Sequence, residues 1–154
     1  MIIAGADPGK MTGLCRVSVP EDDNEMPEIE WADQVEYGYQ GLIQFSSEWL
    51  VGADLLIYES FILRRGGPMT SDQIAPAYAI GVLEVQAAWE MVPTIGRTPA
   101  ENKSAVSDDQ LKKLGLYGPT GHDLRHSRDA IRVVVGYLKN SGHRAVLKKG
   151  WGND

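Results

Sequence analysis

The 154-residue sequence is short of several features, and each shortage excludes a class of protein. Its single cysteine, Cys15, cannot form an internal disulfide and excludes a zinc site built from cysteines. No stretch approaches about 18 consecutive apolar residues, the length that a transmembrane helix needs. The first residues lack the basic region and the cleavage site of a signal peptide. We therefore expect a soluble protein of a reducing compartment, the cytoplasm, with no membrane partner.

The composition is that of an ordinary globular protein. Hydrophobic residues make up 43% of the sequence and charged residues 23%, a balance that argues against global disorder. The length of 154 residues suits one domain with a single hydrophobic core. We assign residues 1–140 to this domain and residues 141–154 to a basic, weakly structured C-terminal tail.

The charge is distributed unevenly along the chain. A net charge of −6 by itself speaks against a nucleic-acid partner. Residues 1–60, however, contain two basic and twelve acidic residues, a net charge of −10, whereas residues 61–154 carry +4. From residue 125 onward, seven basic residues accompany two acids. Such a run is either a solvated basic tail or a phosphate-binding surface beside an acidic centre.

The hydrophobic pattern predicts three strands followed by alternating helices and strands. An Asp-Pro-Gly turn at residues 7–9 joins the first two strands as a hairpin. Antiparallel strands followed by strand–helix alternation are typical of a mixed α/β sheet with helices packed on it. The predicted strands cover residues 2–6, 12–19, 29–35, 54–59 and 91–95, and the predicted helices cover residues 41–51, 72–89, 107–114 and 125–140.

Three carboxylates occupy positions that have both an ordinary and a functional interpretation. Asp7 follows an apolar strand, where aspartate also favours turns. Glu59 ends the apolar run 55–58, and a carboxylate there is desolvated unless it is paired or bound to a metal. Asp129 follows His126 by three residues, so both share one helix face, although an acid near a helix start also complements the helix dipole.

Together, these side chains are suited to a site for a hard cation. Carboxylates and water are the ligands that Mg²⁺ prefers, and His126 shifts the preference toward Mn²⁺. Two ions that share Asp7 as a bridging ligand would stabilise the attacking and departing oxygens of a phosphodiester displacement. Bound cations also explain how acids can lie next to a polyanion.

The segments that carry these residues resemble a known family. Residues 3–13 are similar to the opening strand and Asp-Pro-Gly turn of RuvC-type Holliday junction resolvases of the RNase H-like superfamily. Residues 57–61 are similar to the strand that bears the family's glutamate, and residues 126–130 to its C-terminal acidic helix. The resemblance spans residues 2 to about 138, and the short length is similar to that of phage-encoded members, which work in the host cytoplasm.

The resemblance implies a fold and an activity. The fold would be an RNase H-like mixed five-stranded sheet, three antiparallel strands followed by parallel ones, with helices on both faces and with residues 1–140 as the nuclease domain. The activity would be that of a homodimeric endodeoxyribonuclease that uses Mg²⁺ or Mn²⁺, two ions in each active site. Its substrates in DNA recombination and repair would be four-way junctions and other branched DNA such as forks and flaps.

The resemblance also assigns roles to individual residues. Many family members have aspartate in place of His126, which leaves Asp123 as an alternative ligand beside Asp129. Lys103 resembles the basic residue near the scissile phosphate, and Phe61 is the candidate for stacking on a junction base, at a spacing that differs from the usual one. The expected catalytic residues are Asp7, Glu59, His126, Asp129 and Lys103, and the expected DNA-binding residues are Lys10, Phe61, Arg64, Arg65, Arg125, Arg128, Lys148 and Lys149.

Two other functions remain open from the sequence. A DNA-binding relative without catalytic activity would result if His126 weakens the metal site. An actin-like ATPase domain also has an Asp-x-Gly hairpin, but such folds duplicate the domain and 154 residues cannot hold two copies. The helix around residues 78–89 could form a dimer interface or only cover the sheet.

Overall fold

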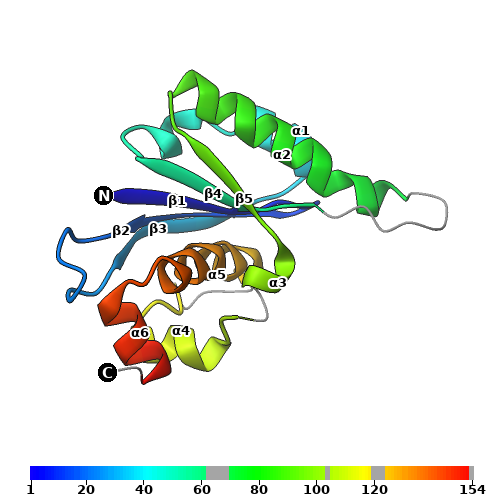
Figure 1. The fold of residues 1–154 in the computed structure, drawn as a ribbon. Coiled ribbons are helices and arrows are strands. Elements are labelled where there is room, and N and C mark those ends of the chain that lie inside the picture. Colours follow the sequence, from blue (N-terminus) through cyan, green and yellow to red (C-terminus); the bar gives the residue numbers. More distant parts are fainter. Residues whose placement is uncertain (62–69, 103–104, 119–123, 153–154) are drawn as a thin grey trace.

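The computed structural model describes residues 1–61, 70–102, 105–118 and 124–152. It consists of a central sheet with helices on both faces (Figure 1). Within the described ranges, no helix combines the length and the apolar character needed to cross a bilayer.

Among the described residues, the sheet has five strands in the order β3-β2-β1-β4-β5. β1 pairs antiparallel with β2, and β2 pairs antiparallel with β3. β4 joins the other side of β1 in parallel, and β5 pairs in parallel with β4. The predicted mixed sheet is confirmed. The strands are β1 (Ile2–Asp7), β2 (Thr12–Ser18), β3 (Glu28–Val35), β4 (Leu55–Glu59) and β5 (Thr94–Arg97).

The helices form one layer on each face of the sheet (Figure 1). One layer contains α1 (Gly38–Gln44), the short 3-10 helix η1 (Ser47–Leu50) and α2 (Ser71–Trp89). The other contains α3 (Pro99–Asn102), α4 (Asp108–Leu114), α5 (Arg125–Asn140) and α6 (Arg144–Trp151).

The alternation of side chains along β1 creates these two layers. Ile3 belongs to the hydrophobic core beneath α5, whereas Ala4 and Ala6 belong to the core beneath α2. These three side chains are completely buried, because β1 lies at the centre of the sheet. Alternate side chains of a strand point to the same face, so Asp7, four residues after Ile3, also lies on the α5 face.

The predicted helix over residues 41–51 is wrong in its extent. The structure divides this segment into α1 and η1, because Phe45 adopts an extended conformation with ψ 125°. The side chain of Ser46 then accepts a hydrogen bond from the backbone N–H of Glu48 at 3.2 Å and caps a new helical turn. The predicted strand over residues 91–95 is likewise displaced to Thr94–Arg97. Met91, with φ 56°, instead lies in the turn that ends α2.

The prediction that the C-terminal tail is weakly structured is wrong, because much of it is helical. α6 occupies most of it; its residues Ala145 and Val146 are buried, and Val146 belongs to the same hydrophobic core as α5. The backbone of Gly150 lies close enough to α4 that a Cβ built there would be 3.3 Å from the side chain of Leu114. The segment is helical because it covers the apolar ends of α4 and α5, a tertiary effect that its short sequence does not reveal.

Candidate metal centre

Asp7 lies at the C-terminal end of β1, the central strand of the sheet. It is 6% exposed, with Gly13 of β2 paired opposite. The turn that follows is closed by Thr12, whose hydroxyl donates to the carbonyl of Gly9 at 3.2 Å and accepts from its N–H at 3.3 Å. Asp7 is therefore held on both sides by hydrogen-bonded backbone.

Two glycines allow α5 to approach this strand pair closely. A Cβ at Gly13 would lie 1.8 Å from the carbonyl oxygen of His126. A Cβ at Gly5 would lie 2.8 Å from the carbonyl oxygen of Ala130 and 2.6 Å from the side chain of Val134. No other residue type leaves room for the helix backbone at this distance. The first two turns of α5 thus lie directly over β1 and β2.

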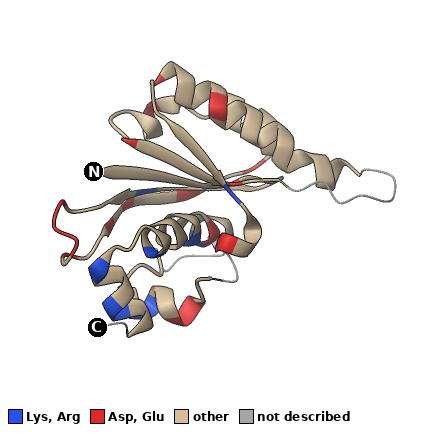
Figure 2. Cartoon of the chain, in the orientation of Figure 1, with Lys and Arg blue, Asp and Glu red and all other residues tan. Residues whose placement is uncertain are grey.

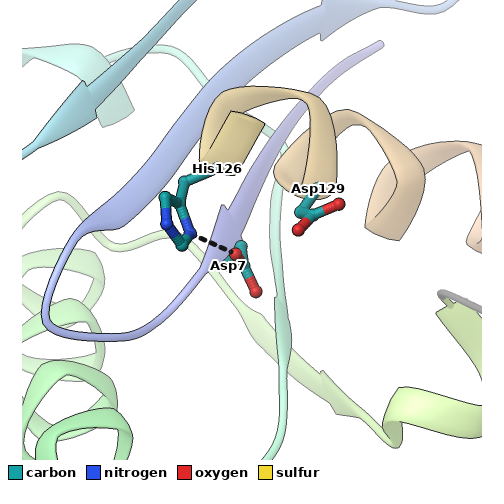
Figure 3. Close-up of side chains that lie close together, drawn as sticks. All are labelled: Asp7, His126 and Asp129. Carbon is teal, nitrogen blue, oxygen red and sulfur yellow. Dashed lines mark hydrogen bonds and ion pairs between the residues drawn. The ribbon is translucent and has the colours of Figure 1, made fainter. Parts of the chain in front are cut away.

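This packing brings the predicted helix ligands to Asp7. Nδ1 of His126 lies 3.1 Å from Oδ2 of Asp7, and Asp129 points toward both from the next turn (Figure 3). One ligand atom from each of the three residues lies within 4.8 Å of the others. Asp129 is 6% exposed, whereas the side chain of His126 is 37% exposed, so the cluster opens to solvent on the histidine side.

Glu59 lies on the neighbouring strand but outside this compact group. β1 and β4 are in parallel register with Ala6 opposite Tyr58, so Glu59 comes next to Asp7 along the sheet edge. Strand alternation places Glu59 on the same face as Ile57, which belongs to the core beneath α5. Within the described residues, the ligand group within 4.8 Å contains only the aspartates and the histidine.

Two residues of the centre were missed by sequence reasoning. Arg132 forms ion pairs with Asp129, one turn earlier on α5, and with Asp108 at the start of α4. Burial lowers the pKa of the Arg132 guanidinium, and the negative charge of Asp7 opposes this shift. The ion pair of Arg132 with Asp129 could be predicted from the sequence, because residues three apart are neighbours on a helix. The ion pair of Arg132 with Asp108 could not be predicted, because it joins two separate helices.

Several predicted residues lie outside the described part of the chain. They are Arg64, Arg65, Lys103 and the alternative ligand Asp123. Phe61 is described, and it lines a cavity of about 380 Å³ together with Glu59, Pro8 and Pro99. The residue predicted to stack on DNA thus adjoins the predicted glutamate ligand.

The predicted DNA-binding cations are divided between the two ends of α5. Lys10 lies in the turn after Asp7, and Arg125 and Arg128 belong to the first turns of α5, beside His126. Arg128 packs over the ring of Tyr117 at 5.1 Å. Lys148 and Lys149 are exposed on α6, beyond the opposite end of α5.

Acidic and basic residues are distributed unevenly over the fold. Figure 2 shows acidic residues along the loop between β2 and β3, and basic residues over α4, α5 and α6. The helical layer that carries Asp129 is thus also the layer in which basic residues gather.

Comparison with solved structures identifies the fold. A structure of RuvC from Thermus thermophilus aligns with 93% of this chain and 98% of its own, with a TM-score of 0.70 and 18% sequence identity. The chain has the RuvC fold. Thermus thermophilus RuvC in complex with a Holliday junction substrate aligns over the same shares of both chains, with a TM-score of 0.71 and 19% identity. No protein-family model and no curated protein matches the sequence.

The RuvC fold accounts for the architecture described above. The predicted RNase H-like sheet with helices on both faces is confirmed by these structures and by the strand order. At 18% and 19% identity the likeness establishes the fold, and the chemistry has to be argued from the side chains of this chain.

Proposed function

We propose that the protein is a metal-dependent endonuclease that cuts branched DNA, with four-way junctions as its main substrate. The observation that carries this proposal is the grouping of Asp7, His126 and Asp129 within 4.8 Å at the sheet edge. The RuvC fold supports it, because the Thermus thermophilus protein with that fold has been solved with a Holliday junction substrate.

The ligand group fits a small divalent cation. Opposite ligands of Mg²⁺ are separated by roughly 4 Å, twice its bond length of about 2.1 Å. The ligand atoms of Asp7, His126 and Asp129 lie within 4.8 Å of one another, so small side-chain movements suffice to bring them into range. Two carboxylates and one imidazole match the preferences of Mg²⁺ and Mn²⁺, with Mn²⁺ favoured by the nitrogen ligand. Glu59, next in register to Asp7, is the residue we expect to complete a site for a second ion.

The residues of the chain then have separate tasks. A bound divalent cation supplies Lewis-acid stabilisation of the negative charge that develops on a phosphate being cut. Asp7 is fixed by the hydrogen-bonded hairpin and provides a rigid ligand at the floor of the centre. His126 is oriented by its contact with Asp7 and, as the most exposed of the three, lies at the mouth of the centre, where a phosphate would enter.

The surface around the centre is suited to a DNA backbone. Lys10 lies in the turn that follows Asp7, and Arg125 and Arg128 share the first turns of α5 with His126, so we expect them to contact phosphates that flank the scissile one. We retain Arg64, Arg65 and Lys103 as further phosphate contacts, and Phe61 as the stacking residue. Lys148 and Lys149, on α6, would contact a more distant part of a large substrate.

We also propose that the protein works as a homodimer, since two symmetric cuts require two active sites. The outer side of α1 and α2 exposes large apolar side chains, including Ile43, Tyr78, Val85 and Trp89, the last of them 73% exposed. Tyr39 and Tyr78 pack together there, with ring centroids 5.3 Å apart. An exposed apolar area of this kind, on the face opposite the candidate centre, is typical of a protein interface.

Cleavage of a labelled four-way junction tests the proposal. The wild-type protein should cut in the presence of Mg²⁺ or Mn²⁺ and should be inactive in EDTA. Asp7→Asn and Asp129→Asn should abolish cleavage while junction binding, followed by gel shift, persists. Asp33→Asn, on an exposed position of β3, is the matched control and should cut normally. Undiminished cleavage by Asp7→Asn would overturn the assignment.

A further inference from the structure

The guanidinium of Arg132 links two carboxylates that come from different helices. Its Nη1 donates to Oδ1 of Asp129, and its Nη2 contacts Oδ1 of Asp108. The side chains of Arg132 and Asp129 are 15% and 8% exposed, whereas that of Asp108 is 46% exposed. Arg132 therefore lies between a buried ligand of the centre and a carboxylate at the surface.

The buried carboxylates of the centre need a positive charge nearby. Asp7 and Asp129 both belong to the group whose ligand atoms lie within 4.8 Å, and both are almost fully buried. Two carboxylates at such a separation repel each other strongly when water is largely excluded. Arg132 contacts Asp129 directly, and the charge of Asp7 also acts on it. It can therefore supply the compensating charge from within the chain.

Arginine is suited to this role by its shape. Its planar guanidinium presents five N–H donors, so different nitrogens can bind two carboxylates at once. Asp108 keeps the group in place from the side of α4, independently of Asp129. If Asp129 turns toward a metal ion, Arg132 still has a partner.

We propose that Arg132 is a positioning residue that serves as the internal counter-cation of the metal centre. It holds Asp129 while no divalent cation is bound, and it releases Asp129 and keeps Asp108 when a divalent cation binds. The inference rests on the proposed metal centre. Because Arg132 competes with the ion for Oδ1 of Asp129 and its positive charge repels the ion, Arg132 lowers the affinity of the centre for divalent cations.

Calorimetric titration with Mn²⁺ tests this role directly. Arg132→Gln should bind Mn²⁺ roughly tenfold more tightly than the wild type, a change that corresponds to one charge-assisted hydrogen bond. The matched control is Lys139→Gln, which removes the same charge from the last turn of the same helix, where Lys139 packs on Trp151, far along α5 from the centre. The control should change Mn²⁺ affinity by less than about twofold, as expected for a solvent-screened charge.

A double-mutant cycle separates the specific contact from general electrostatics. Asp108→Asn removes the second partner of Arg132, so the guanidinium should pair more firmly with Asp129 and Mn²⁺ binding should weaken. In the Arg132→Gln background, Asp108→Asn should have no further effect. Equal effects of Asp108→Asn in both backgrounds would overturn the proposal, because they would show that the two charges act independently.

Thermal unfolding gives a second measurement. In EDTA, Arg132→Gln should melt below the wild type because the carboxylates lose their counter-cation, and Mn²⁺ should raise its melting temperature more than that of the wild type. If Arg132→Gln does not fold, Arg132→Met serves instead. Methionine is long and unbranched but has no charge and no N–H donor, so this variant should also bind Mn²⁺ more tightly.

The outcomes for Arg132 and for the metal centre are distinguishable. Saturable Mn²⁺ binding by the wild type with equal or weaker binding by Arg132→Gln, or by Arg132→Met in its place, would overturn the role of Arg132 alone. If wild-type protein shows no Mn²⁺ binding that Asp7→Asn removes, the metal centre fails and the role of Arg132 fails with it.

Discussion

Replacement of Gly13 by alanine should move the ligands on α5, His126 and Asp129, away from Asp7 on β1. Gly13 pairs with Asp7 across the β1–β2 hairpin and lies under the first turn of α5. An added Cβ would lie 1.8 Å from the carbonyl oxygen of His126, 2.1 Å from its carbonyl carbon and 2.7 Å from the nitrogen of Ser127. These neighbours are backbone atoms, which cannot rotate away as a flexible side chain would.

The size of the effect follows from these distances. Ordinary contact with a Cβ begins at 3.4 Å, so the carbonyl oxygen of His126 has to recede by 1.6 Å. This displacement is half of the 3.1 Å that separates Nδ1 of His126 from Oδ2 of Asp7. A metal centre tolerates errors of only about 0.2 Å in its ligand distances. Overpacking of this kind costs about 1–3 kcal/mol of folding free energy. We expect both a lower stability and a loss of metal binding.

Urea unfolding and calorimetric titration with Mn²⁺ measure the two effects. Gly13→Ala should lower the free energy of unfolding by about 1–3 kcal/mol and weaken Mn²⁺ binding at least tenfold. Gly81→Ala is the control, because a Cβ at this position in α2 has no neighbour within 4 Å and alanine favours a helix. It should leave stability unchanged or slightly raise it. Wild-type stability and Mn²⁺ affinity in Gly13→Ala would refute the close approach of α5 as the cause of the site.

The remaining predictions concern the other face of the sheet. The hydroxyl of Tyr58 donates to Glu84 at 2.5 Å, and burial together with this carboxylate raises the pKa of Tyr58 to about 12. The folded state thus favours the neutral hydroxyl. The stabilisation that results should be complete below pH 10, the ordinary pKa of tyrosine, and should be lost as the pH rises toward 12. Tyr58→Phe should therefore remove this part of the pH dependence of the unfolding free energy measured in urea. Trp89→Glu, on the exposed face of α2, should shift the protein from dimer to monomer in sedimentation analysis; an unchanged molar mass would contradict the proposed interface.

The elements that bear the candidate ligands were predictable because their patterns are local. The apolar run before Asp7 and the one that ends at Glu59 indicated strands, and both are observed, β1 over Ile2–Asp7 and β4 over Leu55–Glu59. The apolar stripe of α5 gave its bounds, Arg125–Asn140, without error. His126 and Asp129 shared a face because residues three apart do so on any helix.

Elements held in place by distant partners were predicted less well. α6 is short and depends on burial of Val146 in the core beneath α5. The break between α1 and η1 depends on the capping interaction at Ser46. Neither feature has a hydrophobic period long enough to identify it in the sequence, because tertiary contacts supply much of the stability of short helices.

The sequence by itself determined which residue types could form a metal centre and on which elements they lie. Only the tertiary structure decided that Asp7, His126 and Asp129 meet, that Glu59 lies beside this group on the next strand, and that Arg132 joins the group with Asp108. The physical reason is that periodicity fixes the face of an element, whereas the distance between elements depends on what fills the space between them. Here that space is left open by glycines in β1 and β2, whose missing side chains admit the backbone of α5.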